Sequence, residues 1–346
     1  MTHKRMSDTP AVADCLAAHN EQAPWQRRRV LLGLTALSLM PAAAGAQTLA
    51  WPERPITIFV PSAPGGAADF TARTFAAYAA RALPGATVLA DNRAGAGGIL
   101  GTIAAKNAPA DGYAFLLSTN STHAANVSLY AKPGYDPQRD FEPVGLFGRF
   151  GTVLMVRANS SHDSLPRLLE FARLNPGKLT FGYYSSSSQV PAELLKARAQ
   201  IDTVGVSYKN ITQIITDLIG GQLDFAFLDM LSASPALQNN SLRAIGVSSP
   251  AREPTLPGVP AVAEVLPGYA VQGWIGLHAP AGTPRAVIER MAQVTQQACA
   301  DDGFRKALES RGMMVESMTP ERMRAFVAED VKRWAEWVRL AGITPQ

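Results

Sequence analysis

The stretch that decides the fold is Ile56-Thr-Ile-Phe-Val60, followed directly by Pro61-Ser-Ala-Pro-Gly-Gly-Ala-Ala-Asp69. The apolar, β-branched run predicts a strand, and the glycine-rich run after it predicts a tight turn. A helical pattern over residues 70–83 completes a strand–turn–helix unit. Such a unit points free backbone N–H groups and the positive end of a helix at one crevice, which favours an anion such as a carboxylate. The same turn could be purely structural, so the rest of the chain has to decide.

From Pro55 onward, β-rich runs alternate with helical patterns of 10–15 residues. This alternation predicts an α/β fold with parallel sheets and helices on both faces. The predicted strands are 56–60, 87–90, 113–118, 152–156, 179–183, 204–208, 224–228, 242–247 and 272–278; the predicted helices are 70–83, 98–108, 165–174, 191–200, 211–220, 284–299 and 301–310. Units on both sides of Gly148 predict two domains, residues 47–149 with 274–346, and residues 150–273.

A final helix is predicted to open at Thr319-Pro-Glu321, with Thr319 as N-cap and Pro320 as its first residue. Its Phe326, Trp334, Trp337 and Val338 are expected to pack as one stripe across the first domain.

The N-terminus predicts export. Arg27-Arg-Arg29 precedes an apolar stretch over residues 30–40, and Ala44-Gly-Ala46 ends the segment. A basic patch, a short apolar core and an A-x-A ending describe a signal peptide, residues 1–46, cleaved before Gln47. The apolar stretch is shorter than the ~20 residues of a membrane span. We therefore expect a soluble periplasmic protein. The arginines also resemble a twin-arginine signal, which leaves the Sec and twin-arginine routes both open.

Composition excludes several classes of function. The signal segment carries half of the formal net charge of +4, so the mature chain is only weakly basic, which argues against nucleic acid. Cys299 is the one cysteine after residue 46, so no intramolecular disulfide is expected. His123, His162 and His278 lie far apart without metal-ligand spacing, so no metal is expected.

No cofactor is expected either. Gly95-Ala-Gly-Gly98 lacks the full dinucleotide motif, and no phosphate-binding loop or nucleophile elbow occurs. The chain is therefore predicted not to be an enzyme. An exported hydrolase is the alternative from another class, because the serine run and His123 could supply its parts. No carboxylate is placed by a motif to orient that imidazole.

Uncharged polar residues follow three predicted strands. Residues 118–123 read Ser-Thr-Asn-Ser-Thr-His, residues 183–188 read Tyr-Tyr-Ser-Ser-Ser-Ser, and Asp229 follows the strand 224–228. Ligands of open α/β sheets bind beyond the carboxyl ends of the strands, where such loops converge. The alternative is that these residues only form turns and helix caps. Together with the Pro-Gly-Gly turn, they predict a neutral cleft that binds a small polar anion without reacting with it.

Motifs over the whole mature chain resemble one family. They include Trp51-Pro-x-Arg-Pro-Ile-Thr57, Val60-Pro-x-Ala-Pro-Gly-Gly-x-x-Asp69, Asn92-Arg-x-Gly-Ala-Gly-Gly98, Pro109-x-Asp-Gly-Tyr113, Tyr208-Lys209, Asp217-Leu-x-Gly-Gly-Gln-Leu-Asp224 and Ala279-Pro-Ala-Gly-Thr-Pro284. In this order they resemble the Bug/TctC family, the periplasmic solute receptors of tripartite tricarboxylate transporters.

This resemblance implies a two-domain periplasmic-binding-protein fold of type II, a Venus flytrap with two doubly wound sheets and a cleft between them. It implies a small carboxylate or related metabolite as ligand and membrane transporter subunits as partners, and a monomer is expected. A receptor that presents its ligand to a sensor kinase is the runner-up. The residues that the resemblance and the strand ends place at the ligand are Ser62, Ala63, Pro64, Gly65, Gly66, Asp69, Thr119, Asn120, Ser121, His123, Ser185, Ser186, Ser187, Ser188 and Asp229.

The chain departs from the family pattern at this predicted site. Ser62 stands where the family usually has an aromatic residue, and Asn210 where it has glycine. Residues 183–189 replace a glycine-rich loop with tyrosines and serines. Fewer glycines leave less room for backbone approach and offer more side-chain hydroxyls. We therefore expect the serines to choose the ligand, the Pro-Gly-Gly turn to hold its carboxylate, and Asp229 to face a donor group; Asp69 is expected to cap its helix as well.

Overall fold

The structure, a computed structural model, describes residues 51–346; the predicted signal peptide lies outside this range. The strand–turn–helix unit at its start is confirmed. Strand β1 (Ile56–Val60) alternates fully buried and half-buried residues, and helix α1 (Ala67–Ala82) begins directly after the turn. β1 pairs in parallel with β2 (Val88–Asn92) on one side and with β3 (Ala114–Thr119) on the other.

The sheet is mixed, which corrects the expectation of parallel sheets. Over the described residues the strand order is β2-β1-β3-β9-β4-β7-β5-β6, with β8 and β10 also paired to β4. Strand β9 (Gln272–Pro280) runs antiparallel to both of its neighbours, and β4 (Phe141–Arg157) runs antiparallel to β7, β8, β9 and β10. These two strands are returns of the chain rather than steps of a strand–helix–strand repeat, so the repeat pattern could not show their direction.

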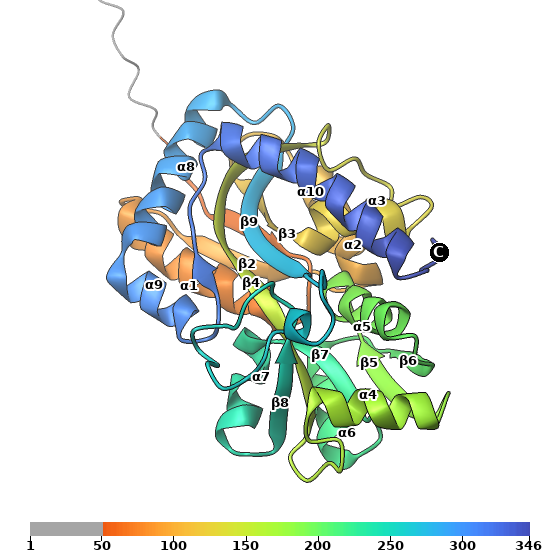
Figure 1. Cartoon of the computed structure of the whole chain (residues 1–346). Helices are drawn as coiled ribbons and strands as arrows, with labels where there is room; N and C mark the ends of the chain where they lie inside the picture. The colour runs from red at the N-terminus through yellow and green to blue at the C-terminus, as the bar shows by residue number, and fades with distance from the viewer. Residues whose placement is uncertain (1–50) are drawn as a thin grey trace, which may run out of the picture. The chain divides into compact units, whose positions relative to one another are not determined.

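Strand β4 joins two groups of strands (Figure 1). Its first part pairs with β9 and with β10 (Met314–Val315), and its last part pairs with β7 (Phe225–Asp229) and β8 (Leu242–Val247). β5 (Leu179–Tyr183) and β6 (Thr203–Ser207) complete the second group. Only residues 152–156 of β4 were predicted as strand. Bulges beside Gly145 and Gly148 interrupt the pairing with β9 and hide the pattern of the earlier part.

Helices cover both groups of strands (Figure 1). Their bounds are α2 (Ile99–Lys106), α3 (Asn126–Leu129), α4 (Leu165–Leu174), α5 (Ser186–Ala199), α6 (Ile211–Gly220), α7 (Met230–Gln238), α8 (Arg285–Ala300), α9 (Asp302–Glu309) and α10 (Pro320–Leu340), with short turns η1 (Ala96–Gly98), η2 (Ser121–Ala125) and η3 (Val262–Glu264). No helix within residues 51–346 combines the length and the apolar character that a membrane span needs.

Helix α10 corrects a second expectation. Thr319 caps it as predicted, since its Oγ1 accepts a hydrogen bond from Arg322 N. Its apolar residues, however, divide between two clusters instead of forming one stripe. Phe326 packs beside Trp274, whereas Trp334 and Val338 are buried in the cluster that contains Leu194 of α5. The helix packs against η2 and against α5, and so it contributes to the core on both sides of the cavity described below.

Candidate functional site

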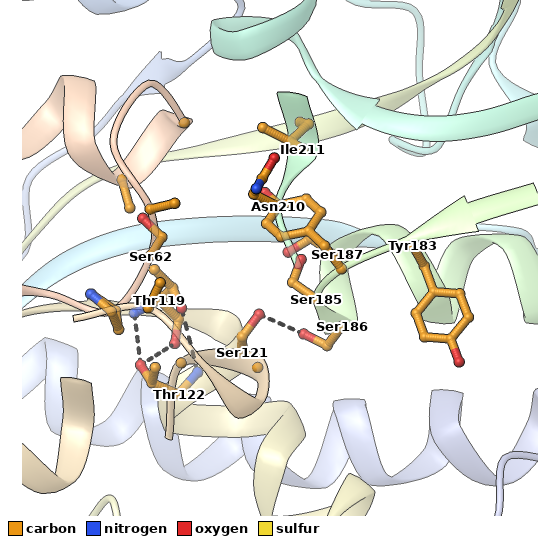
Figure 2. A pocket seen from close by; sticks show the side chains of 18 of the residues that line it. Ser62, Thr119, Ser121, Thr122, Tyr183, Ser185, Ser186, Ser187, Asn210 and Ile211 are labelled. Atoms are coloured by element: carbon orange, nitrogen blue, oxygen red, sulfur yellow. Dashed lines mark hydrogen bonds between the residues drawn. The ribbon is translucent and has the colours of Figure 1, made fainter. Parts of the chain in front are cut away.

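A cavity of about 630 Å³ lies where the loops of the two strand groups meet. Its first wall consists of residues 61–64, 66–68 and 94–98 together with 119–122, after β1, β2 and β3. Its second wall consists of residues 183–187 and 207–211 with Asp229, after β5, β6 and β7. Figure 2 shows side chains from both walls pointing toward one another. A cavity of this size is in the range of small-molecule sites.

The Pro-Gly-Gly turn brings the start of α1 into the first wall. Gly65 has a φ of +90°, which favours glycine, and its N–H donates to Asp69 Oδ2 at 3.0 Å. Gly66 is the N-cap, and no side chain of the described residues caps the helix there. First-turn N–H groups have no partner inside a helix, and Ala67 and Ala68 of that turn line the cavity. The turn therefore leaves backbone donors for an anion.

Two hydroxyl groups near this helix start are also unsatisfied. Ser62 Oγ and Ser232 Oγ are buried and have no hydrogen-bond partner among the described residues. Asn92 Nδ2 donates to the Ser62 carbonyl oxygen at 3.1 Å and fixes the loop. A Cβ atom built on Gly66 would stand 3.9 Å from Ser232 Oγ, so the second hydroxyl lies across from the helix start. Unpaired buried donors are costly, and an anion bound in the cavity, which Ser62 lines, would satisfy the Ser62 hydroxyl.

Asp69 holds the turn from behind the cavity wall. It is buried, it does not line the cavity, and its other carboxylate oxygen accepts from Arg73 Nε at 2.9 Å. Burial opposes ionisation, but the hydrogen bonds from Arg73 and Gly65 outweigh it and hold the pKa of Asp69 below its ordinary value. Gly65 likewise does not line the cavity, while Ser62, Ala63, Pro64 and Gly66 do.

The loop after β3 divides its residues between cavity and core. Thr119, Asn120 and Ser121 line the cavity, whereas His123 is fully buried behind the wall. The His123 ring lies 4.1 Å from the His278 ring, centroid to centroid, and its Nδ1 is 3.0 Å from Thr122 Oγ1. Burial lowers the pKa of His123 to about 3. Its side chain therefore supports the wall as a neutral group.

The serine run forms the start of α5. Ser188 is buried and does not line the cavity, because its Oγ accepts from Tyr184 N at 3.0 Å and from Ser185 N at 3.2 Å. Ser185, Ser186 and Ser187 do line it. Ser186 and Ser187, however, bond to Asn120 and Ser121 of the opposite wall. Figure 2 shows the bond between Ser121 and Ser186.

Asp229 both caps a helix and lines the cavity. Its Oδ1 accepts from Ser232 N at 2.9 Å at the start of α7, and Tyr184 Oη donates to Oδ2 at 3.4 Å. The residue is 4% exposed, and burial raises the pKa of its carboxyl above the ordinary value. The two readings of Asp229 made from the sequence, a cap and a cavity residue, are therefore compatible.

Sequence reasoning missed several lining residues. Tyr130 and Phe150 do not follow a predicted strand, and the pattern of Gly95-Ala-Gly-Gly98 indicates only a partial dinucleotide loop and a family motif. Tyr208 and Lys209, part of a family motif, both line the second wall, where Tyr208 Oη donates to Asp217 Oδ2 at 2.6 Å. Tyr208 and Lys209 follow directly after the end of β6 at Ser207, and this position is the signal that could have identified them.

A cavity between two groups of strands, at the ends of several of them, is where α/β proteins bind small ligands. The family model of the tripartite tricarboxylate transporter family receptor matches residues 71–343, and the chain belongs to this family. The resemblance predicted from its motifs is thereby confirmed.

Relatives extend over nearly the full length of the chain. The UPF0065 protein in the tcbD-tcbE intergenic region of Pseudomonas sp. is 36% identical over 90% of this chain and 94% of its own length. Protein BugT of Bordetella pertussis is 32% identical over 84% of this chain and 90% of its own.

Solved structures confirm the periplasmic-binding-protein fold. Rpa4515 of R. palustris, solved with adipate, has a TM-score of 0.83 at 29% identity and covers 86% of this chain and 100% of its own. The periplasmic binding protein BugD has a TM-score of 0.80 at 30% identity, over 86% of this chain and 100% of its own. MatC of Rhodopseudomonas palustris, solved with bound malate, has a TM-score of 0.78 at 29% identity, over 83% and 99%.

Proposed function

We propose that this protein is a periplasmic receptor that binds a small organic carboxylate in the cavity and delivers it to membrane transporter subunits. The observation that carries the proposal is the uncapped start of α1, which lines the cavity beside the unpartnered Ser62 hydroxyl in the described part of the chain. Backbone N–H groups at a helix start form a ready anion site. Family membership and the adipate and malate complexes of similar structures support the same ligand class.

The far end of the ligand is proposed to carry a hydrogen-bond donor. Asp229 is buried at the cavity, and among residues 51–346 it forms no ion pair. A buried carboxylate repels a second carboxylate but is stabilised by an amine or a hydroxyl group. The favoured ligand is therefore an amino acid or a hydroxy acid.

Two further parts of the proposal concern the whole chain. Residues 47–149 with 274–346, and residues 150–273, form two domains that close on the ligand. Residues 1–46 are a signal peptide that is removed on export. Mass spectrometry of the periplasmic protein is expected to find Gln47 at the N-terminus, and recovery of an intact N-terminus from the periplasm would overturn this part.

The test of binding is a thermal-shift screen followed by calorimetry on the mature protein. The panel contains malate, adipate, amino acids and aromatic acids, together with the amide of each acid, which lacks the carboxylate charge, as a control. A ligand present at about 100 times its Kd stabilises the folded state by about 2.7 kcal/mol and so raises the melting temperature. Binding of an acid but not of its amide supports the proposal. A panel in which no acid binds, or in which amides bind equally well, contradicts it.

A further inference from the structure

Four side chains connect the two walls of the cavity directly. Asn120 Nδ2 donates to Ser187 Oγ at 3.0 Å and to Ser186 Oγ at 3.3 Å, and Ser187 Oγ donates to Asn120 Oδ1 at 3.2 Å. The Oγ atoms of Ser121 and Ser186 are 2.7 Å apart (Figure 2). We call these four residues, Asn120, Ser121, Ser186 and Ser187, the brace. Each of its hydroxyl and amide groups has a partner within the brace, with no ligand needed.

The brace is anchored to the strands at which the two groups of strands join. Asn120 is fully buried at the end of β3, and its Oδ1 also accepts from the backbone N–H of Trp274 in β9 at 3.3 Å. β9 pairs with both β3 and β4, so Asn120 is fixed from the first wall. Ser186 and Ser187 are fixed in the second wall because they form the first turn of α5.

The hydrogen-bonding groups of the brace are paired, whereas, within the described residues, the Ser62 hydroxyl at the same cavity is not. Ser62, which lines the cavity, has a hydroxyl group without a partner in the described chain, as expected for a group that is free to bond to a ligand. The brace groups are satisfied, and a ligand that bonded to them would first have to break those bonds. Because buried polar groups are costly when unpaired, the paired arrangement favours walls that touch.

We propose that the brace holds the two walls together when no ligand is bound, and that a ligand enters only after these bonds open. Asn120, Ser121, Ser186 and Ser187 are then positioning residues and not ligand contacts. The inference rests on the proposed function only for its kinetic test, since the contact between the walls can be tested without any ligand.

The ligand-free test is a cross-link. The variant Ser121→Cys/Ser186→Cys replaces two hydroxyl groups whose oxygens are 2.7 Å apart, a placement suited to a disulfide. Cys299, the one free cysteine among the described residues of the mature chain, is buried. We expect mild oxidation to form the disulfide in the ligand-free protein and dithiothreitol to reverse it. A disulfide that forms only after adipate or another acid is added would overturn the proposal, because the walls would then meet only around a ligand.

The kinetic test uses Ser186→Ala/Ser187→Ala, with Ser310→Ala as the matched control, at the exposed residue that follows α9 outside the cavity. If the brace is formed both without and with ligand, losing it destabilises both closed states equally. The association and dissociation rates of adipate, or of the tightest acid of the panel, should then rise together by roughly tenfold while the Kd changes by less than about twofold. A dissociation rate that rises alone, with a weaker Kd, would show that the brace forms only in the complex.

The cross-link and the binding measurements distinguish a failure of the brace from a failure of the proposed receptor function. If no acid binds wild-type protein but the ligand-free cross-link forms, the proposed function fails and the brace stands. If acids bind but the cross-link needs them, the brace fails and the receptor function stands. Restoring one hydroxyl, in Ser187→Ala alone, is expected to give rates between those of the wild type and the double variant.

Discussion

The Pro-Gly-Gly turn of the first wall and the serine run of the second wall use their polar groups in opposite ways. The first wall leaves groups open: the start of α1 has no side-chain cap from the described residues, and Ser62 Oγ has no partner there. In the second wall, Ser186 and Ser187 have hydrogen-bond partners, and so do the Asp229 carboxylate and the Tyr208 hydroxyl. Both walls contain polar residues in the sequence. Only the structure shows which of their hydrogen-bonding groups already have a partner and which do not.

This difference changes how ligand choice is explained. The sequence predicts that the serines select the ligand through their hydroxyl groups. Because Ser186 and Ser187 bond to the first wall, their contribution is proposed to be the closure of the cavity. Recognition would then depend on the start of α1 for the carboxylate and on Asp229 for the opposite end.

The largest effect is expected for Gly66→Val. Gly66 has an extended backbone, and a Cβ there meets only Ser232 Oγ, at 3.9 Å, so the fold should tolerate valine. The branched side chain would fill the space in which the carboxylate meets the helix start, and we expect affinity to fall more than about hundredfold, the effect of losing a charge-assisted site. Calorimetry measures this loss.

Gly258→Val is the matched control for Gly66→Val, because a Cβ at Gly258 meets no atom within 4 Å and the position lies outside the cavity. Equal affinities for the two valine variants would show that the Pro-Gly-Gly turn is only a turn.

A smaller effect is expected for Asp229→Asn. Asparagine can still accept the hydrogen bond from Ser232 N, so the cap of α7 should survive. Losing the charge should weaken an amino or hydroxy acid by about ten- to hundredfold, whereas a plain dicarboxylate should bind unchanged or better. The measurement is calorimetry on matched pairs such as 4-aminobutyrate, which has one carboxylate and one amine, and succinate, which has two carboxylates. Identical behaviour of every ligand would reduce Asp229 to a helix cap.

The pH dependence of binding is a second test of the proposed role of the Asp229 charge. Burial raises the pKa of Asp229, so its charge is lost at a higher pH than for an ordinary aspartate. Affinity for an amine-bearing ligand should therefore fall as the pH drops through that raised pKa, and this fall should be absent in Asp229→Asn. A fall of equal size in both proteins would assign it to another group.

Local parts of this architecture could be predicted from sequence, and non-local parts could not. The unit from Ile56 to Ala82 is contiguous, so its turn residues and apolar pattern suffice. The direction of β9 depends on its pairing with β3 and β4, which are distant in sequence. Strand ends correctly indicated Thr119, Asn120 and Asp229 as cavity residues.

The orientation of single side chains was the harder part. The π-helical turn η2 directs Ser121 to the cavity and His123, two residues later, into the core. On α5, Ser187 likewise lines the cavity, whereas its neighbour Ser188 is buried and does not. No pattern of residue types distinguishes these neighbours, because each outcome depends on what packs behind the turn.

The histidines behind the first wall predict a loss of stability in acid. The pKa of His123 lies near 3 and that of His278 lies well below its ordinary value, in both cases because of burial. The unfolded chain takes up protons below about pH 6.5, while the folded protein does not. The free energy of unfolding should therefore fall by about 1.4 kcal/mol per pH unit for each histidine as the pH drops from about 6.5.

Urea unfolding of wild type and His123→Phe, at about pH 7.5 and about pH 5.5, measures this term. Phenylalanine keeps an aromatic ring beside Phe141 and removes the titrating group. The variant should lose less stability than wild type between the two pH values, and parallel losses would mean that His123 does not carry the effect.

The smallest effect is expected for Ser62→Ala. The direction in which it changes the ligand-free melting temperature distinguishes the two walls. Ser62 Oγ has no partner in the described chain, so removing it should leave the ligand-free melting temperature unchanged or slightly higher. The same change should weaken a bound carboxylate by about two- to tenfold, the value of one hydrogen bond. Ser186→Ala, by contrast, removes a paired hydroxyl and should lower the ligand-free melting temperature. Thermal shift and calorimetry on both variants check this. A lower ligand-free melting temperature for Ser62→Ala would mean that its hydroxyl is already engaged, and the contrast between an open wall and a paired wall would fail.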